Sequence, residues 1–385
     1  MNRLLYIGMD VHKESFTLST YHVTLDENEL TQDFIGDPLK ITDATASSVE
    51  KYIKNLKKML NIKATDNVRI QCGYEAGCLG FDLHFQLKAK GIECVILAPS
   101  TIQKSANAKK KKNDPLDSKA IAMALANKTY KSVHVPDKDD LNVREYLRMR
   151  NAHKDAVKKV KQQILAFWTK AHITWLHGLK FDHVLLKETL DEYITSLENY
   201  TAKLERLDKR IGEFAQGDKY QEKVAELGCL LGIKTQAAMT MISEISDFSR
   251  FRTASEFASF LGLVPGENSS GEKTQRTSIT KSGNSQCRKT LIEAAAGICR
   301  GKVGHKSKEL LRRQALCNNP IAISYADRAN ERLRSKFYRL NLRNKKPANV
   351  AKTAVARELA CFIWGIMTDT YDGKVPRSDE YALGK

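Results

Sequence analysis

Two short apolar runs, each ending in a carboxylate, constrain the fold of this chain more than any other feature. Residues 4–9 (LLYIGM) lead into Asp10, and residues 68–74 (VRIQCGY) lead into Glu75. Apolar runs of this length are typical of strands. If the two strands are neighbours in a sheet, both carboxylates lie at one of its edges.

The segments around these runs indicate strands alternating with helices. Residues 15–21 alternate as a half-exposed strand, and a weaker strand is expected within 30–35. Helical spacing predicts a helix over 49–60, and the second run is followed by a helix over 78–90 and a strand over 92–97. This order predicts a mixed α/β domain over residues 1–135.

The middle of the chain, residues 140–216, reads as helical. Residues 142–170 are polar, rich in lysine and of helical periodicity, and from 186 to 214 apolar residues recur every four and three positions. That spacing is typical of a coiled-coil seam. One helix packed on a neighbour within the same chain explains the spacing equally well, so self-association stays open.

The composition changes again after Gly217. A helix, a hairpin turn and a second helix are expected over about 230–245, and a stretch rich in Gly, Ser and Asn covers 262–283. An alanine-rich helix over about 286–300 and a final helix over about 349–367 follow. We expect a mainly α domain over 217–370 and a tail over 371–385.

The charge of the chain points to a polyanionic partner. Lys and Arg number 63 against 45 Asp and Glu, a formal net charge of +18. Nucleic acid is the first choice, because phosphate neutralisation dominates such binding. No apolar stretch is long enough to span a bilayer and no lipidation signal is present, which argues against a membrane partner.

The N-terminus and the cysteines indicate a cytoplasmic protein, associated with the nucleoid when it is bound to DNA. Asp10 interrupts the first apolar run too early for a signal peptide. The eight cysteines are scattered and form no CxxC pair. They read as free thiols in a reducing compartment, so neither a zinc site nor a disulfide framework is expected.

Four carboxylates could do chemistry together. Asp114 and Asp117, three residues apart, open a helix-like stretch and would share one of its faces. With Asp10 and Glu75 they offer hard oxygen ligands, which suit Mg²⁺ or Mn²⁺ acting on a phosphodiester. The alternative is structural: Pro115 makes Asp114 a natural N-cap, and Asp117 then complements the helix dipole.

Other residues are candidates for contacts with nucleic acid or for catalysis. A glycine-flanked serine in the loop 262–271 could be a nucleophile, although such a loop is also an ordinary surface turn. The turn around Gly232 could present N–H groups to a phosphate, or could be a helix C-cap. The candidate phosphate contacts, each alternatively part of a solvated basic face, are Lys109, Lys110, Lys111, Lys112, Lys234, Lys281, Arg334 and Arg339.

Several motifs in order resemble a known family. They are IGMDVHK at 7–13, YEAG at 74–77, NDPLDSKA at 113–120, FASFLGLVP at 257–265, SG at 270–271 and ITKSGN at 279–284. The chain resembles the DEDD-type insertion-sequence transposases, the bridge-RNA-guided recombinases of the IS110 and IS1111 group. The likeness covers all but the extreme C-terminal tail.

The resemblance implies a fold, a site and partners. It implies an N-terminal ribonuclease H-like domain similar to the RuvC resolvase, then a coiled coil and a C-terminal transposase domain. Asp10, Glu75, Asp114 and Asp117 would be the Mg²⁺-binding tetrad, and Ser270 the nucleophile that forms a phosphoserine link to DNA. Members act as oligomers, here a dimer or a tetramer, with a structured noncoding RNA that pairs with target and donor DNA.

Three local features separate this chain from the family pattern or leave the pattern ambiguous. Ala76-Gly77 follows the glutamate where a Thr or Ser often precedes the glycine, and Lys234 replaces the second glycine of the hairpin. Ser269 stands beside Ser270 as an alternative nucleophile.

We predict a serine-using, Mg²⁺-dependent transposase. The alternatives are a metal-dependent nuclease or resolvase that uses water, and a noncatalytic nucleic-acid-binding scaffold.

Overall fold

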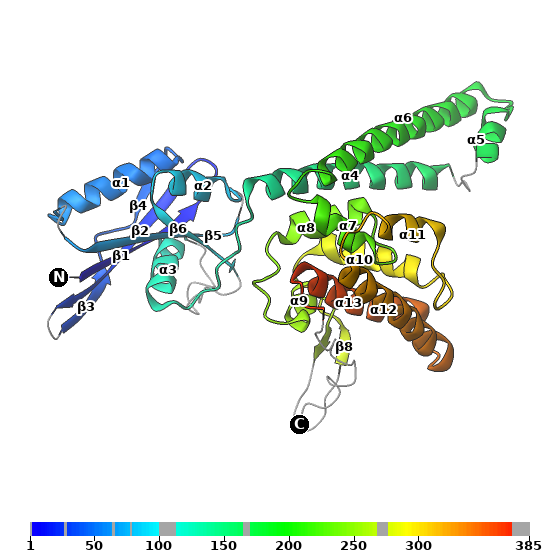
Figure 1. Cartoon of the computed structure of the whole chain (residues 1–385). Helices are drawn as coiled ribbons and strands as arrows, with labels where there is room; N and C mark the ends of the chain where they lie inside the picture. Colours follow the sequence, from blue (N-terminus) through cyan, green and yellow to red (C-terminus); the bar gives the residue numbers. More distant parts are fainter. Residues whose placement is uncertain are drawn as a thin grey trace. The chain divides into compact units, whose positions relative to one another are not determined.

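The computed structural model divides the chain into two compact units, Met1–Val135 and Pro136–Lys385, which Figure 1 draws in blue to cyan and in green to red. It describes residues 2–26, 29–63, 66–77, 79–99, 113–164, 170–267 and 276–371. The cysteines within these ranges are free and buried, as expected. Among the described residues, no helix combines the length and apolar character needed to cross a bilayer.

The first unit is built on one mixed sheet with the order β3-β2-β1-β5-β6, and β4 also pairs with β2. β1 is antiparallel to β2 and parallel to β5, and β5 is parallel to β6. The expected mixed α/β region is thereby confirmed; the short strand β4 was not predicted. The strands are β1 Asn2–Val11, β2 Phe16–Asp26, β3 Glu29–Phe34, β4 Leu39–Ile41, β5 Val68–Glu75 and β6 Glu93–Leu97.

Helices cover both faces of this sheet (Figure 1). On one face α1 (Ala46–Met59) and α2 (Asp82–Ala89) bury Leu5, Ile7 and Met9 of β1 in the main core of the unit. On the other face lies α3 (Asp114–Asn127), whose Ile121 and Leu125 pack beside Leu97. The alternation of side chains along β1 therefore separates an apolar core from the face that carries Asp10.

Two glycines let α3 approach the sheet closely. A Cβ atom on Gly8 would overlap the backbone of α3 at Ser118 and Ala122. A Cβ on Gly73, which is in register with Gly8, would lie 2.9 Å from both methyl carbons of Leu125. The close approach brings the first turn of α3 to the edge of the sheet where β1 and β5 end.

The second unit is mainly helical, as predicted for this part of the chain. Its largest core joins α4, α6 to α8 and α9 to α13, and the small hairpin β7–β8 lies between α9 and α10 in sequence. The elements are α4 Lys138–Gln163, α5 Lys170–His177, α6 Val184–Ala215, α7 Gln221–Gly228, α8 Thr235–Ile245, α9 Ala254–Phe260, β7 Pro265–Glu267, β8 Arg276–Ile279, α10 Ser285–Ile298, α11 Lys308–Gln314, α12 Pro320–Tyr338, the π-helical η2 Arg339–Arg343 and α13 Ala348–Met367.

The heptad pattern packs within the chain over its central part. Leu197 of α6 is buried against Val157 and Val160 of α4, and Tyr193 and Tyr200 flank this contact. These residues therefore follow the intrachain interpretation. The pattern also begins with Leu186, which is 56% exposed, and self-association through that end of α6 stays a prediction.

The predicted phosphate contacts Arg334 and Arg339 belong to a basic segment, residues 332–346, that forms the end of α12, all of η2 and the turn that follows. Sequence reasoning did not predict the helix α12. Two of the segment's cations pair with one buried carboxylate: Lys336 Nζ donates to Glu358 Oε2 of α13 at 2.6 Å, and Arg332 donates to the other oxygen. Glu358 is only 5% exposed, so this pairing compensates a buried carboxylate.

Candidate metal and phosphodiester site

Asp10, the penultimate residue of β1, and Glu75, the last residue of β5, lie on the same face of the sheet. Met9 is in register with Tyr74 in the parallel pair β1–β5, so the next residues, Asp10 and Glu75, follow side by side. Both belong to the same alternation as Gly8 and Gly73, the positions covered by α3. The predicted acidic edge is thus built from strand register.

Asp114 reaches this edge from the first turn of α3. The N-cap of the helix is Asn113, with extended backbone angles, and Asp114 and Asp117 lie within the first turn. The alternative interpretation of Asp114 as the N-cap is therefore wrong by one residue. The helix dipole still favours both carboxylates at this end.

His12 joins the two aspartates. Its Nε2 lies 3.3 Å from Asp10 Oδ2 and 3.7 Å from Asp114 Oδ1. One donor atom from each of Asp10, His12 and Asp114 lies within 4.8 Å of the others, a spacing compatible with a shared metal ion. Among the described residues, that group includes neither Glu75 nor Asp117.

Sequence reasoning did not select His12. The residue belongs to the IGMDVHK motif, but nothing in the spacing from Asp10 to His12 shows that the turn after β1 directs the imidazole back to the carboxylates. A histidine two residues after an aspartate close to the end of a strand was the signal that could have identified it.

The electrostatics of the cluster fit a cation. Burial raises the pKa of Asp10 most strongly, neighbouring His12 lowers that pKa, and the charges of Asp114 and Asp117 raise it again. Like charges on nearby carboxylates repel, and a divalent ion relieves that repulsion. Carboxylate oxygens suit Mg²⁺ and Mn²⁺, and the imidazole nitrogen adds a ligand that Mn²⁺ accepts more readily.

Several predicted residues lie outside the described ranges. Ser269 and Ser270 fall in the segment 268–275, which joins β7 to β8 in sequence, and Lys109, Lys110, Lys111 and Lys112 precede α3. The structure therefore does not define where the serines lie relative to the carboxylates. Their roles stay predictions.

Of the four described basic candidates, three are exposed. Lys234, Lys281 and Arg339 present their side chains at the surface, and Lys234 Nζ lies 2.8 Å from Glu309 Oε1. Arg334 is 6% exposed, and its guanidinium donates to the carbonyls of Ile298 at 3.2 Å and of Lys302 and His305 at 2.6 Å. We correct the prediction for Arg334, because a buried guanidinium bound to backbone carbonyls cannot reach a phosphate.

The turn around Gly232 faces the protein interior. Of the helix, turn and helix predicted over about 230–245, the second helix is α8, whereas the first is α7, which ends at Gly228 and so lies earlier than predicted. Gly232 has φ +77°, and a Cβ there would overlap the backbone of Ala294 in α10. Leu231 N also donates to the buried Asn330 Oδ1 at 2.8 Å. This glycine is required for close helix packing, and the structure favours that role over a phosphate contact.

An acidic cluster at the carboxyl ends of parallel strands, in a strongly basic chain, defines a protein that acts on phosphodiesters. Comparison with known proteins agrees. A model of DEDD-type transposases of the IS110 group matches residues 7–173, and one described as transposase of the IS116/IS110/IS902 family matches residues 226–310.

Individual relatives cover most of the chain. A putative transposase, y4qE, of Sinorhizobium fredii is 32% identical over 306 residues, 76% of this chain and 74% of that protein. The transposase for insertion sequence element IS1533 of Leptospira borgpetersenii is 28% identical over 365 residues, 90% of this chain and 99% of that protein. The chain belongs to the IS110/IS116 family of transposases. The family implies an enzyme that binds DNA and catalyses its cleavage and strand transfer, and the DEDD domain suggests use of a divalent metal ion.

Proposed function

We propose that this chain is a Mg²⁺- or Mn²⁺-dependent recombinase that moves an insertion sequence by serine-mediated DNA cleavage and strand exchange. The observation that carries the metal dependence is the convergence of Asp10, His12 and Asp114 at one sheet edge. The serine mechanism is supported by the SG motif at 270–271 in a glycine-rich loop.

We propose further that Met1–Val135 has a ribonuclease H-like, RuvC-like fold. Three antiparallel strands followed by two parallel strands, with helices on both faces, support this assignment. Within the second unit, we propose a helical segment over 140–216, a transposase domain over 217–370 and a tail over 371–385.

Each site residue has a proposed role. Asp10 and Asp114 would hold the metal ion together with the imidazole of His12, and Glu75 and Asp117 would complete the acidic tetrad. When bound, the ion stabilises the charge that develops on the scissile phosphate. Ser270 Oγ gives up its proton to water and forms a bond to phosphorus as the bond to the leaving strand breaks, and the oxygen of that strand takes up a proton from water. Ser269 is the alternative nucleophile.

Sequence choice is proposed to come from a structured noncoding RNA that pairs with target and donor DNA. The net charge of +18 supports binding to nucleic-acid backbones, while base pairing would supply specificity. Lys109 to Lys112, Lys234, Lys281 and Arg339 are the proposed backbone contacts. We also propose that the chain acts as a homo-oligomer, either a dimer or a tetramer.

A suicide DNA substrate tests the serine mechanism. The wild-type chain should accumulate a covalent protein–DNA adduct, and Ser270→Ala should abolish the adduct while Ser269→Ala keeps it. Loss of the adduct only in Ser269→Ala would reassign the nucleophile. Unchanged cleavage in both variants would show that water attacks, which is the nuclease or resolvase alternative.

Metal titration tests the acidic site independently. Asp10→Asn and Asp114→Asn should each weaken Mn²⁺ binding by at least about tenfold, which is the smallest loss typical of changes at the outer-shell partners of metal ligands, and should abolish adduct formation. Full activity in both variants would contradict a catalytic role and support the noncatalytic scaffold.

A further inference from the structure

A cavity of about 470 Å³ lies at the end of α3 opposite to the carboxylates. Its walls include Leu4 and Tyr6 of β1, Arg69 of β5, and Lys128 and Tyr130 after the helix. The volume falls in the range of small-ligand sites, about 300–1,000 Å³. Both the cavity and the helix that separates it from the acidic edge belong to the first unit.

The cavity exists because α3 ends before the sheet does. The helix stops at Asn127, and its C-cap Lys128 adopts a left-handed conformation with φ 54° that turns the chain away. The paired positions Leu4 with Arg69 and Tyr6 with Gln71 extend the sheet beyond the helix end, on the face that α3 covers elsewhere. α3 therefore does not cover this part of the sheet face, and β1 and β5 form the base of the cavity there.

Hydrogen bonds hold Arg69 in place beside the cavity. Its Nε and Nη2 donate to the two oxygens of Glu93 at 3.1 and 2.9 Å, and Gln71 Nε2 donates to the same carboxylate at 2.7 Å. The guanidinium is therefore oriented while its side chain remains 68% exposed. Lys128 is also exposed, so two cations lie near a single carboxylate. The net charge beside the cavity is therefore positive, which favours binding of an anion.

Two aromatic rings accompany the cations. Tyr6 and Tyr130 are half-buried and line the cavity. Burial raises the pKa of Tyr130, as do Glu93 and Tyr6, while Arg69 lowers it. Rings beside fixed cations are the combination that holds a stacked base and its phosphate.

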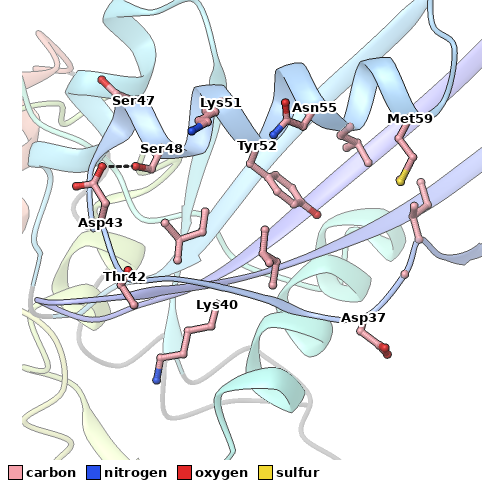
Figure 2. A pocket seen from close by; sticks show the side chains of 15 residues that line it. Asp37, Lys40, Thr42, Asp43, Ser47, Ser48, Lys51, Tyr52, Asn55 and Met59 are labelled. Atoms are coloured by element: carbon pink, nitrogen blue, oxygen red, sulfur yellow. Dashed lines mark hydrogen bonds between the residues drawn. The ribbon is translucent and has the colours of Figure 1, made fainter.

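The larger groove of the same unit lacks this combination. A hollow of about 810 Å³ lies between α1 and the segment 35–43. In Figure 2 the side chain of Tyr52 points from α1 toward the strands of the sheet. Its two cations, Lys40 and Lys51, are matched by Asp37 and Asp43. The groove therefore has no preference for an anion.

We propose that the cavity beside Tyr130 binds an unpaired nucleotide of a nucleic-acid strand. The base packs against Tyr6 or Tyr130, and Arg69 and Lys128 contact the phosphate. A base inside a duplex has both faces stacked on its neighbours, so only an unpaired one can enter. The proposal goes beyond the function proposed above, because it needs neither the carboxylates nor the serine.

Photo-crosslinking of the full-length chain tests the proposal. Unstructured RNA and DNA strands, each with one 5-iodouracil, are irradiated with the protein in about 0.3 M salt, which weakens nonspecific backbone binding. Adducts should map to peptides that contain Tyr6 or Tyr130, and unlabelled single strands should compete better than duplex. Adducts from RNA alone or DNA alone identify the strand that is bound.

Matched variants locate the site. Tyr130→Ala should weaken strand binding at this site by about 5- to 150-fold, the range for loss of one stacked base, whereas Tyr130→Phe should retain it. Lys128→Asn should weaken it without unfolding, since Asn tolerates a positive φ. Lys58→Gln, an exposed position on α1 across the sheet, is the control for charge.

Three results would overturn the proposal: adducts that avoid both tyrosines, equal competition by duplex, or unchanged crosslinking in Tyr130→Ala and Lys128→Asn. Asp10→Asn keeps the test separate from catalysis. The crosslinks should persist in that variant even when its strand-transfer activity is lost. Failure of the recombinase mechanism would likewise leave the crosslinks in place.

Discussion

Gly8 shows how one residue determines the acidic site. Its missing side chain allows the backbone of α3 to lie against β1, and this contact helps to bring Asp114 within reach of His12. In the sequence Gly8 is one small residue in an apolar run, with no sign that a helix more than 100 residues later packs on it. Arg334 is the opposite case: in sequence it resembles its basic neighbours, whereas its place in the structure is the core.

Replacing Gly8 by Ala should both destabilise the first unit and weaken metal binding. The added methyl group overlaps the backbone of Ser118 and Ala122, so α3 must shift, at a cost of about 1–3 kcal/mol or more. Urea unfolding and Mn²⁺ titration measure the two effects. Gly212→Ala in α6 meets no atom within 4 Å and should stabilise by about 0.5–1 kcal/mol. Equal effects of the two substitutions would contradict the close contact at Gly8.

Arg334→Met should reduce the free energy of unfolding by about 2–4 kcal/mol. The substitution removes donors from the carbonyls of Ile298, Lys302 and His305. The DNA affinity of the folded fraction should not change. Arg339→Gln, at an exposed position, should do the reverse and lower DNA affinity with little change in stability. Filter binding at several salt concentrations, beside thermal unfolding, separates the two roles.

At the scale of elements, periodicity predicted most helices and strands but did not specify their partners. The spacing along α6 is compatible with a second copy of the chain or with α4, and packing of Leu197 on Val157 and Val160 selects α4 for the central part. The helix α12 was missed because its basic residues were interpreted as phosphate contacts or as a solvated basic face. Two of those charges instead pair with the buried Glu358.

Leu197→Ala should destabilise the α4–α6 pair by about 2–4 kcal/mol, as expected for a truncated core leucine. Leu186→Ala, at the exposed end of the same pattern, should stay within about 0.5 kcal/mol for the monomer. Urea unfolding gives both values, and sedimentation gives the oligomeric state. A shift toward monomer in Leu186→Ala would show that this end of α6 joins copies; an unchanged state would remove Leu186 from any interface.

The contact between α1 and α2 should weaken in acid. Hydrogen bonds from Lys54 and Lys90 lower the pKa of Glu50 from its usual 4.5 to about 2. Because the folded value is depressed, the contribution of Glu50 is complete above about pH 4.5 and is lost as the pH falls toward 2. The difference in urea midpoint between wild type and Glu50→Gln should therefore shrink over this interval. It should also shrink in high salt, since the Glu50 side chain is partly exposed to solvent.

At the scale of the whole molecule, the chain divides where its composition changes. Residues before Pro136 form a sheet with its own core, and those after it form helices around a separate core. All three donors of the Asp10–His12–Asp114 cluster belong to the first unit. Ser270 belongs to the second part of the sequence, so the proposed chemistry requires both units.

Residues 1–135 should therefore fold alone and bind Mn²⁺, yet form no covalent adduct with DNA. Circular dichroism, a cooperative thermal transition and metal titration check the first part, and the suicide substrate checks the second. An unfolded fragment would show that the first unit depends on the second. An adduct formed by the fragment would exclude Ser270 as the nucleophile.

The sequence by itself determined the local features of this protein. Apolar runs and helical spacing are local properties, so they predicted the strands that end in Asp10 and Glu75, the mixed α/β region and the helical remainder; ordered motifs gave the family. Tertiary packing decided the rest, because contacts between distant residues leave no local pattern. It placed His12 between Asp10 and Asp114, buried Arg334, paired α6 with α4, and left the cavity beside Tyr130 where α3 ends before the sheet.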